Sequence, residues 1–230
     1  MINIKFRFIA ALTAAALLAT ACGGGSSSNN PPPNPDPDPD DGTGGITGTG
    51  VAVGPITGFS SVIVNGVTYD TSSATFTQDG VSATQSDFAV GQVVLVTGTI
   101  DDSTSGTADT VTFDDNVDGP VTSVDDVARS FIVLGQTVFV SATTSFDDSC
   151  PATLNELLEV AAVEVSGPVR ADGSIEASRI ECKAVAGELE VMGLVSNLNA
   201  GAMTFEINAL VIDYSAAVLD NFPSAGVINN

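Results

Sequence analysis

Histidine and tryptophan are absent from this sequence, and basic residues are scarce. Among 230 residues, six are Lys or Arg, 28 are Asp or Glu, and two are Tyr. Without histidine there is no Ser-His-Asp or Cys-His catalysis, no His-ligated metal and no ordinary general base near neutral pH. The acidic excess repels phosphate backbones, and the shortage of Tyr and Trp leaves few platforms for stacking bases or sugars. We therefore predict no nucleic-acid partner, and we assign no catalytic residue and no cofactor.

A long apolar run is also missing, so no segment is expected to cross a bilayer as a helix. The longest run, Phe8 to Leu18, follows Lys5 and Arg7 and precedes small residues. This layout is typical of an export signal, which we place at residues 1–21. With the signal removed, the chain keeps all of its acidic residues and only four basic ones, namely Arg129, Arg170, Arg179 and Lys183.

The end of the export signal, "LLATAC", resembles the lipobox of bacterial lipoproteins. The resemblance implies that Cys22 becomes the acylated first residue and a membrane anchor. The alternative is an ordinary secretory signal followed by a free cysteine, which is a liability in an oxidising compartment. Gly23 stands where enterobacterial lipoproteins of the inner membrane carry Asp, which favours the outer membrane, with the periplasmic or surface face left open.

Residues 22–54 consist mainly of Gly, Ser, Asn, Pro, Thr and Asp. Such a composition buries too little apolar surface to offset the entropy of ordering. The alternation of Pro and Asp favours extended polyproline geometry, so we interpret this segment as a tether that separates a folded part from the membrane.

A hairpin pattern repeats along the rest of the chain. "SSVIVNGVTYDT" matches "SFIVLGQTVFVS" at a shift of 69 residues, and the shift continues downstream, where Gly98 meets Gly167 and Val111 meets Ile180. A third copy follows at a shift of 74, where Phe131 meets Phe205. The Asn65-Gly66 pair suits a type I′ turn, but the third turn reads Asn-Ala and is expected to be the most altered.

The order of elements within a copy predicts the fold class. In the second copy, three strands are followed by "PATLNELLEV", with Leu154, Leu157 and Leu158 at helical spacing, and then by two more strands. This is the order of the OB-fold, a small Greek-key barrel, and a sandwich of the same hairpins is the alternative. We predict an all-β protein of tandem five-stranded barrels with one short helix in each. In the first copy "DFAVG" replaces the helix, and a loop or single turn is expected there.

These patterns resemble a known family. "GPITGFSSVIVNGVTYDTSSATF", "VGQVVLVTG", "GPVTSVDDVARSFIVLGQTVFVSATTSF" and "DGSIEASRIE" are similar to the tandem modules of the bacterial family called domain of unknown function 5666. We expect module 1 at 55–118, module 2 at 119–186 and a partial module 3 at 187–230. The resemblance implies an architecture and brings no catalytic residue.

The third copy is expected to end after its third strand. An open barrel leaves unpaired backbone groups along an edge. We therefore expect this segment to pack on module 2 or to take strands from a partner, and the plain alternative is a truncated gene product.

Cys150 and Cys182 occur only in module 2. Their equivalents in module 1 are Val81 and Phe113, which are both apolar and suggest two sites that face one core. In an exported chain this predicts a disulfide, and the alternative is two reduced, buried thiols.

Paired acids recur at Asp101-Asp102, Asp114-Asp115, Asp125-Asp126 and Asp147-Asp148. Two carboxylates suit a glycosidase or a calcium site, but Asp is also common in turns, where its side chain bonds to the backbone. We prefer the turn interpretation and assign no metal ligand. The expected function is a structural or binding role, toward a protein or glycan of the cell envelope, with weak calcium binding or a carboxylate-dependent glycan hydrolase as alternatives.

Overall fold

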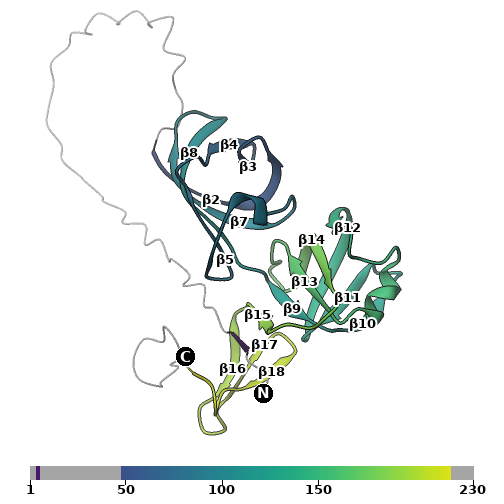
Figure 1. The fold of residues 1–230 in the computed structure, drawn as a ribbon. Coiled ribbons are helices and arrows are strands. Elements are labelled where there is room, and N and C mark those ends of the chain that lie inside the picture. Colours follow the sequence, from purple (N-terminus) through teal and green to yellow (C-terminus); the bar gives the residue numbers. More distant parts are fainter. Residues whose placement is uncertain (1–3, 6–47, 219–230) are drawn as a thin grey trace, which may run out of the picture.

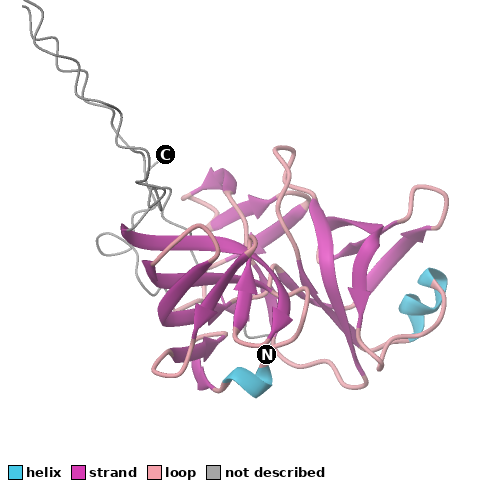
Figure 2. Ribbon diagram, turned by 90° about the horizontal axis from the view of Figure 1, so that it is seen from above, coloured by secondary structure: helices cyan, strands magenta, loops and turns pink. Residues whose placement is uncertain are grey.

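The computed structural model describes residues 4–5 and 48–218, which form two β-barrels and a smaller sheet in succession (Figure 1). Strands dominate, and the helices among these residues are two short 3-10 turns (Figure 2). The prediction of an all-β fold is confirmed. In this described part of the chain, no helix is both long and apolar enough to span a bilayer.

The first barrel is a closed ring of five strands. They are β2 (Gly48–Phe59), β3 (Val62–Val64), β4 (Val67–Asp70), β7 (Val93–Ile100) and β8 (Ser105–Phe113). β2 pairs with β3 and β7, β3 pairs with β4, β7 pairs with β8, and a parallel pairing of β4 with β8 completes the ring. This order is that of an OB-like barrel, so the sandwich alternative is excluded.

The second barrel repeats this topology. Its strands are β9 (Val117–Gly119), β10 (Val121–Asp125), β11 (Ser130–Val133), β12 (Gln136–Phe146), β13 (Ala162–Ser166) and β14 (Ile175–Lys183). β9 and β10 are halves of one strand interrupted at Pro120: β9 pairs with β13, and β10 pairs with β11. The parallel pair Tyr69↔Gly106 of the first barrel becomes Val138↔Ile175, each partner shifted by 69 residues, as the sequence predicts.

The third segment continues the repeat. It contains β15 (Leu189–Val191), β16 (Val195–Asn199), β17 (Thr204–Ile207) and β18 (Leu210–Asp213). The cross-strand pair Phe205↔Ile212 matches Phe131↔Val138 and Val62↔Tyr69 in the two barrels. The three hairpins therefore share one register.

The third segment packs on the second barrel, as one of the two expectations had it. Phe205, Ile207, Ile212 and Tyr214 belong to the same hydrophobic cluster as the core of that barrel. β15 extends its sheet by pairing antiparallel with β9. On the other edge of β15 lies the short β1 (Ile4–Lys5), in parallel orientation. Residues 219–230 lie outside the described residues.

The three hairpin turns differ as their sequences predict. Asn65 and Gly66 both have positive φ, at 52° and 82°, as a type I′ turn requires. Leu134 and Gly135 repeat this at 44° and 75°, although a leucine rarely adopts such an angle. In the third turn Asn208 keeps a positive φ of 50° but Ala209 does not, so this turn is the altered one.

Ordered structure begins before the expected boundary at Pro55. β2 starts at Gly48, inside the predicted tether, and pairs with β7 from Gly48 to Pro55. Its outward-facing Val51 and Val53 are exposed, and the Gly-Thr pattern around them resembles a linker more than a strand. Cys22, the rest of the tether and the predicted export signal apart from β1 lie outside the described residues.

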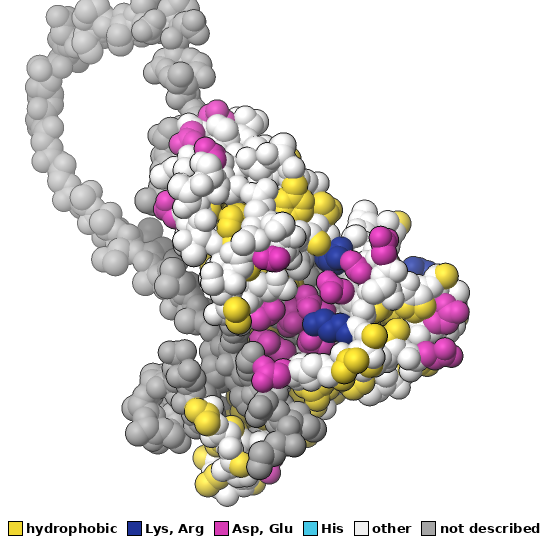
Figure 3. Space-filling view, in the orientation of Figure 1, with side chains coloured by type: hydrophobic (Ala, Val, Ile, Leu, Met, Phe, Trp, Pro, Cys, Tyr) yellow, Lys and Arg dark blue, Asp and Glu magenta, His cyan; other side chains and the backbone are white. Residues whose placement is uncertain are grey.

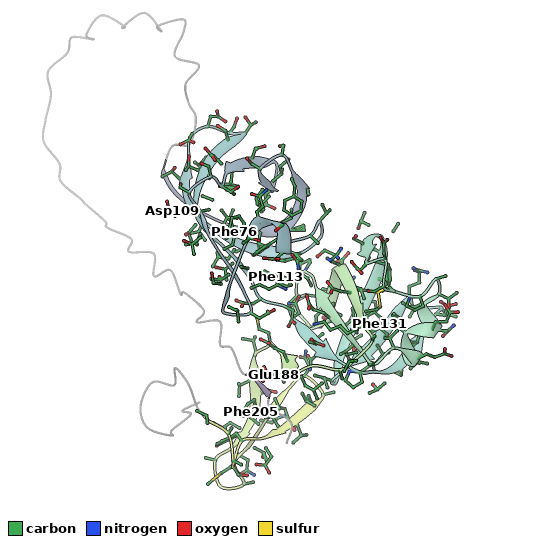
Figure 4. All side chains as sticks on the ribbon, viewed as in Figure 1. Phe76, Asp109, Phe113, Phe131, Glu188 and Phe205 are labelled. Atoms are coloured by element: carbon green, nitrogen blue, oxygen red, sulfur yellow. A yellow bond between two sulfur atoms is a disulfide. The ribbon has the colours of Figure 1, made fainter. Side chains whose placement is uncertain are left out.

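The two barrels differ in the segment between their third and fourth strands. The first barrel inserts a hairpin of β5 (Thr75–Gln78) and β6 (Val81–Ala83) before the 3-10 turn η1 (Gln85–Asp87). Its core contains Phe76 and Phe113 (Figure 4). The ring of Phe88 makes an edge-to-face contact with each of them. The second barrel has no such hairpin among its described strands, and carries a longer turn, η2 (Leu154–Glu159), with Leu154 and Leu157 buried.

The predicted disulfide is confirmed: Cys150 and Cys182 are bonded, with Cα atoms 4.9 Å apart. One premise for it was wrong. Phe113, the equivalent of Cys182, is fully buried, but Val81, the equivalent of Cys150, is 65% exposed. The reason is the inserted hairpin, which carries Val81 outward in the first barrel, whereas the second barrel replaces it with a turn that stays against β14.

Candidate functional site at the barrel junction

The link between the two barrels consists of residues 114–116, and its last residue forms three hydrogen bonds. Asn116 lies between the end of β8 and the start of β9, and its N–H donates to the carbonyl of Val165 at 2.9 Å. Its side-chain oxygen accepts the N–H of Gly167 at 2.7 Å. Its carbonyl accepts the N–H of Met192, at 2.9 Å. Asn116, which follows the first barrel in the chain, is therefore bonded to both the second barrel and the third segment.

A second set of contacts joins the loop before β7 to the second barrel. The N–H of Val93 donates to the hydroxyl of Ser166 at 2.7 Å, and the hydroxyl of Ser178 donates to the carbonyl of Gly91 at 2.5 Å. Gly91 has a φ of +94°, and a Cβ there would lie 2.7 Å from the carbonyl oxygen of Ser178. Only glycine permits this approach of the two backbones.

Acidic side chains gather around a basic one between the two barrels (Figure 3). We call this set the junction cluster; its members are Asp79, Asp115, Asp118, Glu164, Glu190 and Lys183. One carboxylate oxygen from each of Asp79, Asp115 and Glu190 lies within 4.8 Å of the others. The same holds for Asp115, Asp118 and Glu164, so Asp115 belongs to both triads.

Strand register places three of these acids in a row. Glu190 on β15 is directly opposite Asp118 on β9, which is directly opposite Glu164 on β13. Like charges at directly opposite positions destabilise a sheet. Each member stands in a short apolar strand, "VDG", "AVEVS" or "LEV", where a charged residue is unusual.

The first barrel supplies the remaining carboxylates. Asp79 is at the tip of the inserted β5–β6 hairpin, in an Asp-Gly turn whose residues both have positive φ. The N–H of Asp79 donates to the carbonyl of Phe113, at 3.0 Å. Asp115 follows β8, and its N–H donates to Oδ1 of Asp79 at 3.4 Å. The inserted hairpin thus brings Asp79 to the junction.

The cluster is buried and incompletely neutralised. Asp115, Asp118, Glu164 and Glu190 are between 3% and 8% exposed. Lys183 bridges Asp118 and Glu164, with Nζ 2.7 Å from an oxygen of each. Oδ1 of Asp115 and Oδ1 of Asp118 are buried without a hydrogen-bond partner. At about 5 Å and an effective dielectric constant of about 20, each pair of like charges repels by roughly 3 kcal/mol.

The pKa values reflect this crowding. Burial, together with the negative charges of Glu164, Glu190, Asp79 and Asp118, raises the pKa of Asp115 to about 9. Burial also raises the pKa of Glu164, although Lys183 works in the opposite direction. Burial opposes the charge of Lys183, but hydrogen bonds to Asp118 and Glu164 outweigh it and raise its pKa. The cluster therefore favours bound positive charge.

The acid pairs singled out in the sequence are mostly turn residues, as the preferred interpretation had it. Asp102 accepts hydrogen bonds from Thr104 and Ser105 in the β7–β8 turn. Asp125 accepts two backbone N–H groups after β10. Asp147 accepts the N–H of Ser149 and pairs with Arg179 at 2.7 Å. Of the four pairs, only the one at 114–115 contributes a member to the junction cluster.

Four members of the cluster were not anticipated from the sequence. Asp79, Asp118, Glu164 and Glu190 are single acids, and the sequence pointed only to pairs. One sequence feature could have indicated these residues. Asp118, Glu164 and Glu190 each lie in the centre of a short apolar strand. Such a residue needs a partner inside the fold.

A hollow of about 510 Å³ lies on the second barrel, away from the junction cluster. It is bounded by the β10–β11 turn, with Asp126 and Arg129, and by Phe146, Thr153 and Leu154 near η2. The turn between the first two strands is one of the loops that OB-folds use to bind oligomeric ligands. Its volume is within the usual range for small-ligand sites.

The fold and junction define a class: tandem OB-like barrels that are stacked through direct backbone contacts. The chain belongs to the family described as Domain of unknown function (DUF5666), which it matches twice, over residues 52–112 and 118–181. These two ranges coincide with the two barrels. No curated protein and no solved structure matches the chain.

Proposed function

We propose that this chain is a non-catalytic structural protein of the cell envelope, an exported lipoprotein that holds a stack of small barrels away from the membrane. The observation that carries the proposal is the pair of hydrogen bonds between the barrels, from Val93 N–H to the hydroxyl of Ser166 and from the hydroxyl of Ser178 to the carbonyl of Gly91. Beside them, Asn116 of the link is bonded to the second barrel and to the third segment. A short hydrogen-bonded link of this kind fixes one barrel against the next, whereas domains on a flexible linker move independently. A fixed stack suits a spacer or a scaffold.

The glycan hydrolase alternative is disfavoured by the burial of the carboxylates. A glycosidase needs an acid and a second carboxylate on either side of a sugar, about 5 to 9.5 Å apart. The junction carboxylates are nearly inaccessible, and Lys183 occupies the space between two of them. The acids at Asp102, Asp125 and Asp147 are used as turn caps.

Binding of an envelope protein or glycan is proposed at the hollow of the second barrel. Arg129 provides a charged group at its rim, and Phe146 and Leu154 provide apolar surface. An apolar surface with a few polar groups is typical of ligand sites. Replacing Arg129 with Ala is expected to weaken binding of isolated envelope glycan, and Arg170→Ala, which leaves the hollow intact, is the control.

The location is tested by lipid labelling of the full chain in a bacterial host. We expect labelled palmitate to be incorporated at Cys22 and the protein to fractionate with the outer membrane. The Cys22→Ser variant should lose the label and become soluble in the periplasm, with an unchanged melting temperature. Retention of the wild-type chain in the cytoplasm would contradict the proposal.

A further inference from the structure

The junction cluster contains three carboxylates in addition to the two that Lys183 bridges. Lys183 lies 2.7 Å from both Asp118 and Glu164, which neutralises part of one triad. The other triad is formed by Asp79, Asp115 and Glu190, with one oxygen of each within 4.8 Å of the others. Three carboxylates at this separation are a ligand set for a cation.

An independent observation points to a ligand in the same place. Asp115 is 3% exposed and Asp118 is 7% exposed, and Oδ1 of each is buried without a hydrogen-bond partner. Buried carboxylate oxygens almost always have a partner, because leaving one without water or a donor is costly. Asp115 and Asp118 each contribute one carboxylate oxygen to a triad of the cluster. A cation between the carboxylates would supply the missing partner.

The chemistry of the donor atoms selects the kind of cation. Every candidate ligand is a carboxylate oxygen, and the chain has no histidine. Both cysteines of the described residues are joined in the disulfide. Zinc prefers nitrogen and sulfur ligands, whereas calcium accepts six to eight oxygens in flexible geometry. Magnesium demands a smaller, near-octahedral site and retains its waters, which a buried set of large carboxylates serves poorly.

We propose that Asp79, Asp115 and Glu190 bind one Ca²⁺ ion at the junction of the repeats. Lys183 remains the counter-ion of Asp118 and Glu164. Asp79 comes from the first barrel, Asp115 from the link and Glu190 from the third segment. The ion therefore joins the first barrel, the link and the third segment, and the β5–β6 hairpin of the first barrel brings Asp79 to it.

The proposal is tested by titrating calcium into the mature chain after removal of metals with a chelator. Isothermal titration calorimetry should show one ion bound per chain, and magnesium at equal ionic strength should bind at least tenfold more weakly. The melting temperature should rise with calcium. Amide exchange should slow together in β15 and in the β5–β6 hairpin, since the ion holds both.

Two variants and a matched control locate the site. Asp79→Asn alters a half-exposed hairpin tip, so it should fold normally and lose at least tenfold in calcium affinity. Asp115→Asn keeps this buried side chain neutral, as the raised pKa of Asp115 does at pH 7 when no ion is bound. The melting temperature in chelator should therefore stay close to that of the wild-type chain, and it should no longer rise with calcium. Asp148→Asn is the control, because Asp148 is exposed and holds the equivalent position in the second barrel. Its affinity should equal that of the wild-type chain.

Two outcomes would overturn the proposal. One is the absence of calcium binding at millimolar concentration. The other is binding that Asp79→Asn and Asp115→Asn leave unchanged, which would place the ion on exposed turn acids instead. Loss of binding in Asp148→Asn, with Asp79→Asn unaffected, would have the same meaning. None of these results depends on where the protein is located in the cell.

Discussion

The two barrels share one topology and one register but are stabilised by different side chains. In the first barrel, Phe88 follows η1 and contacts the rings of Phe76 and Phe113. At the equivalent position the second barrel has Leu157 in η2, beside a disulfide that the first barrel lacks. Backbone geometry at the turns and the close strand contacts is thus the shared part of the repeat, whereas the core chemistry differs between copies.

The outward faces near the junction differ as well. Leu95 in β7 is 38% exposed, whereas its equivalent Glu164 in β13 is 8% exposed because the neighbouring units cover it. Asp114 is likewise replaced by Lys183. A partly exposed leucine in the first barrel thus corresponds to a buried acid in the second.

The largest effect is expected from truncating the core beneath each 3-10 turn. Phe88→Ala should lower the free energy of unfolding of the first barrel by about 3 to 5 kcal/mol, and Leu157→Ala that of the second by about 2 to 5 kcal/mol. Residue-resolved amide exchange in denaturant should place each loss in its own barrel. Equal weakening of both barrels by either variant would show that they unfold as one unit.

Removal of the disulfide should destabilise the second barrel almost as much as Leu157→Ala does and leave the first barrel unchanged. Cys150→Ser combined with Cys182→Ser releases a loop closed over 32 residues of sequence separation. Chain entropy then predicts a loss of about 3 to 4 kcal/mol in the second barrel. Amide exchange in the first barrel should not change, and adding a reductant to the wild-type chain should reproduce the effect. A reductant that leaves the second barrel unaffected would contradict this prediction.

Two equivalent glycines should respond alike despite the different cores. A Cβ at Gly98 would overlap the carbonyl oxygen of Thr107, and a Cβ at Gly167 would overlap that of Glu176. Gly98→Ala and Gly167→Ala should each cost about 1 to 3 kcal/mol, because the paired strands must move apart. Chemical denaturation measures this, with Gly187→Ala as a control because no atom lies within 4 Å of a Cβ there. A large effect in only one barrel would break the equivalence.

The smallest effect is expected at the aspartates that cap the turn before the last strand of each barrel. Hydrogen bonds from Ser105 and Thr104 lower the pKa of Asp102 to about 2, and those from Ser174 lower the pKa of Asp172. A lowered carboxyl pKa stabilises the fold above the unfolded value of 3.8, and this stability is lost as the pH falls toward 2. Asp102→Asn should therefore lower the denaturation midpoint at pH 7 and make no difference near pH 2.

Asp172→Asn is the matched change in the second barrel. It should shift the midpoint less than Asp102→Asn does, because Asp172 accepts two hydrogen bonds and Asp102 accepts four. A larger shift for Asp172→Asn, or a difference from wild type that persists at pH 2, would show that these bonds do not set the stability of the turns.

The barrels could be predicted from the sequence because their determinants are local. The spacing of Val62, Gly66 and Tyr69 recurs at Phe131, Gly135 and Val138, and it fixes the hairpin register in advance. The β5–β6 hairpin was also within reach, since Asp79-Gly80 is a typical two-residue turn. The start of β2 could not be predicted, because its Gly and Thr residues pair through the backbone and bury little apolar surface.

The junction cluster could not be predicted, because it depends on contacts between distant parts of the chain. Asp79 and Glu190 meet only after two barrels have closed and β15 has paired with β9. The residues that flank Asp79 and Glu190 in the sequence do not indicate that either acid binds a ligand. An acid in the centre of a buried strand indicates that a partner exists, and the fold alone identifies it.

The most direct test of the stacked arrangement is a measurement of residual dipolar couplings on the mature chain in millimolar calcium. Backbone couplings from the first barrel, Gly48–Phe113, and from the second, residues 117–183, are fitted separately. The stack predicts one alignment tensor that fits both sets with equal magnitude and orientation. Two tensors of different magnitude would show that the barrels reorient independently, and the structural role proposed for the junction would then be wrong.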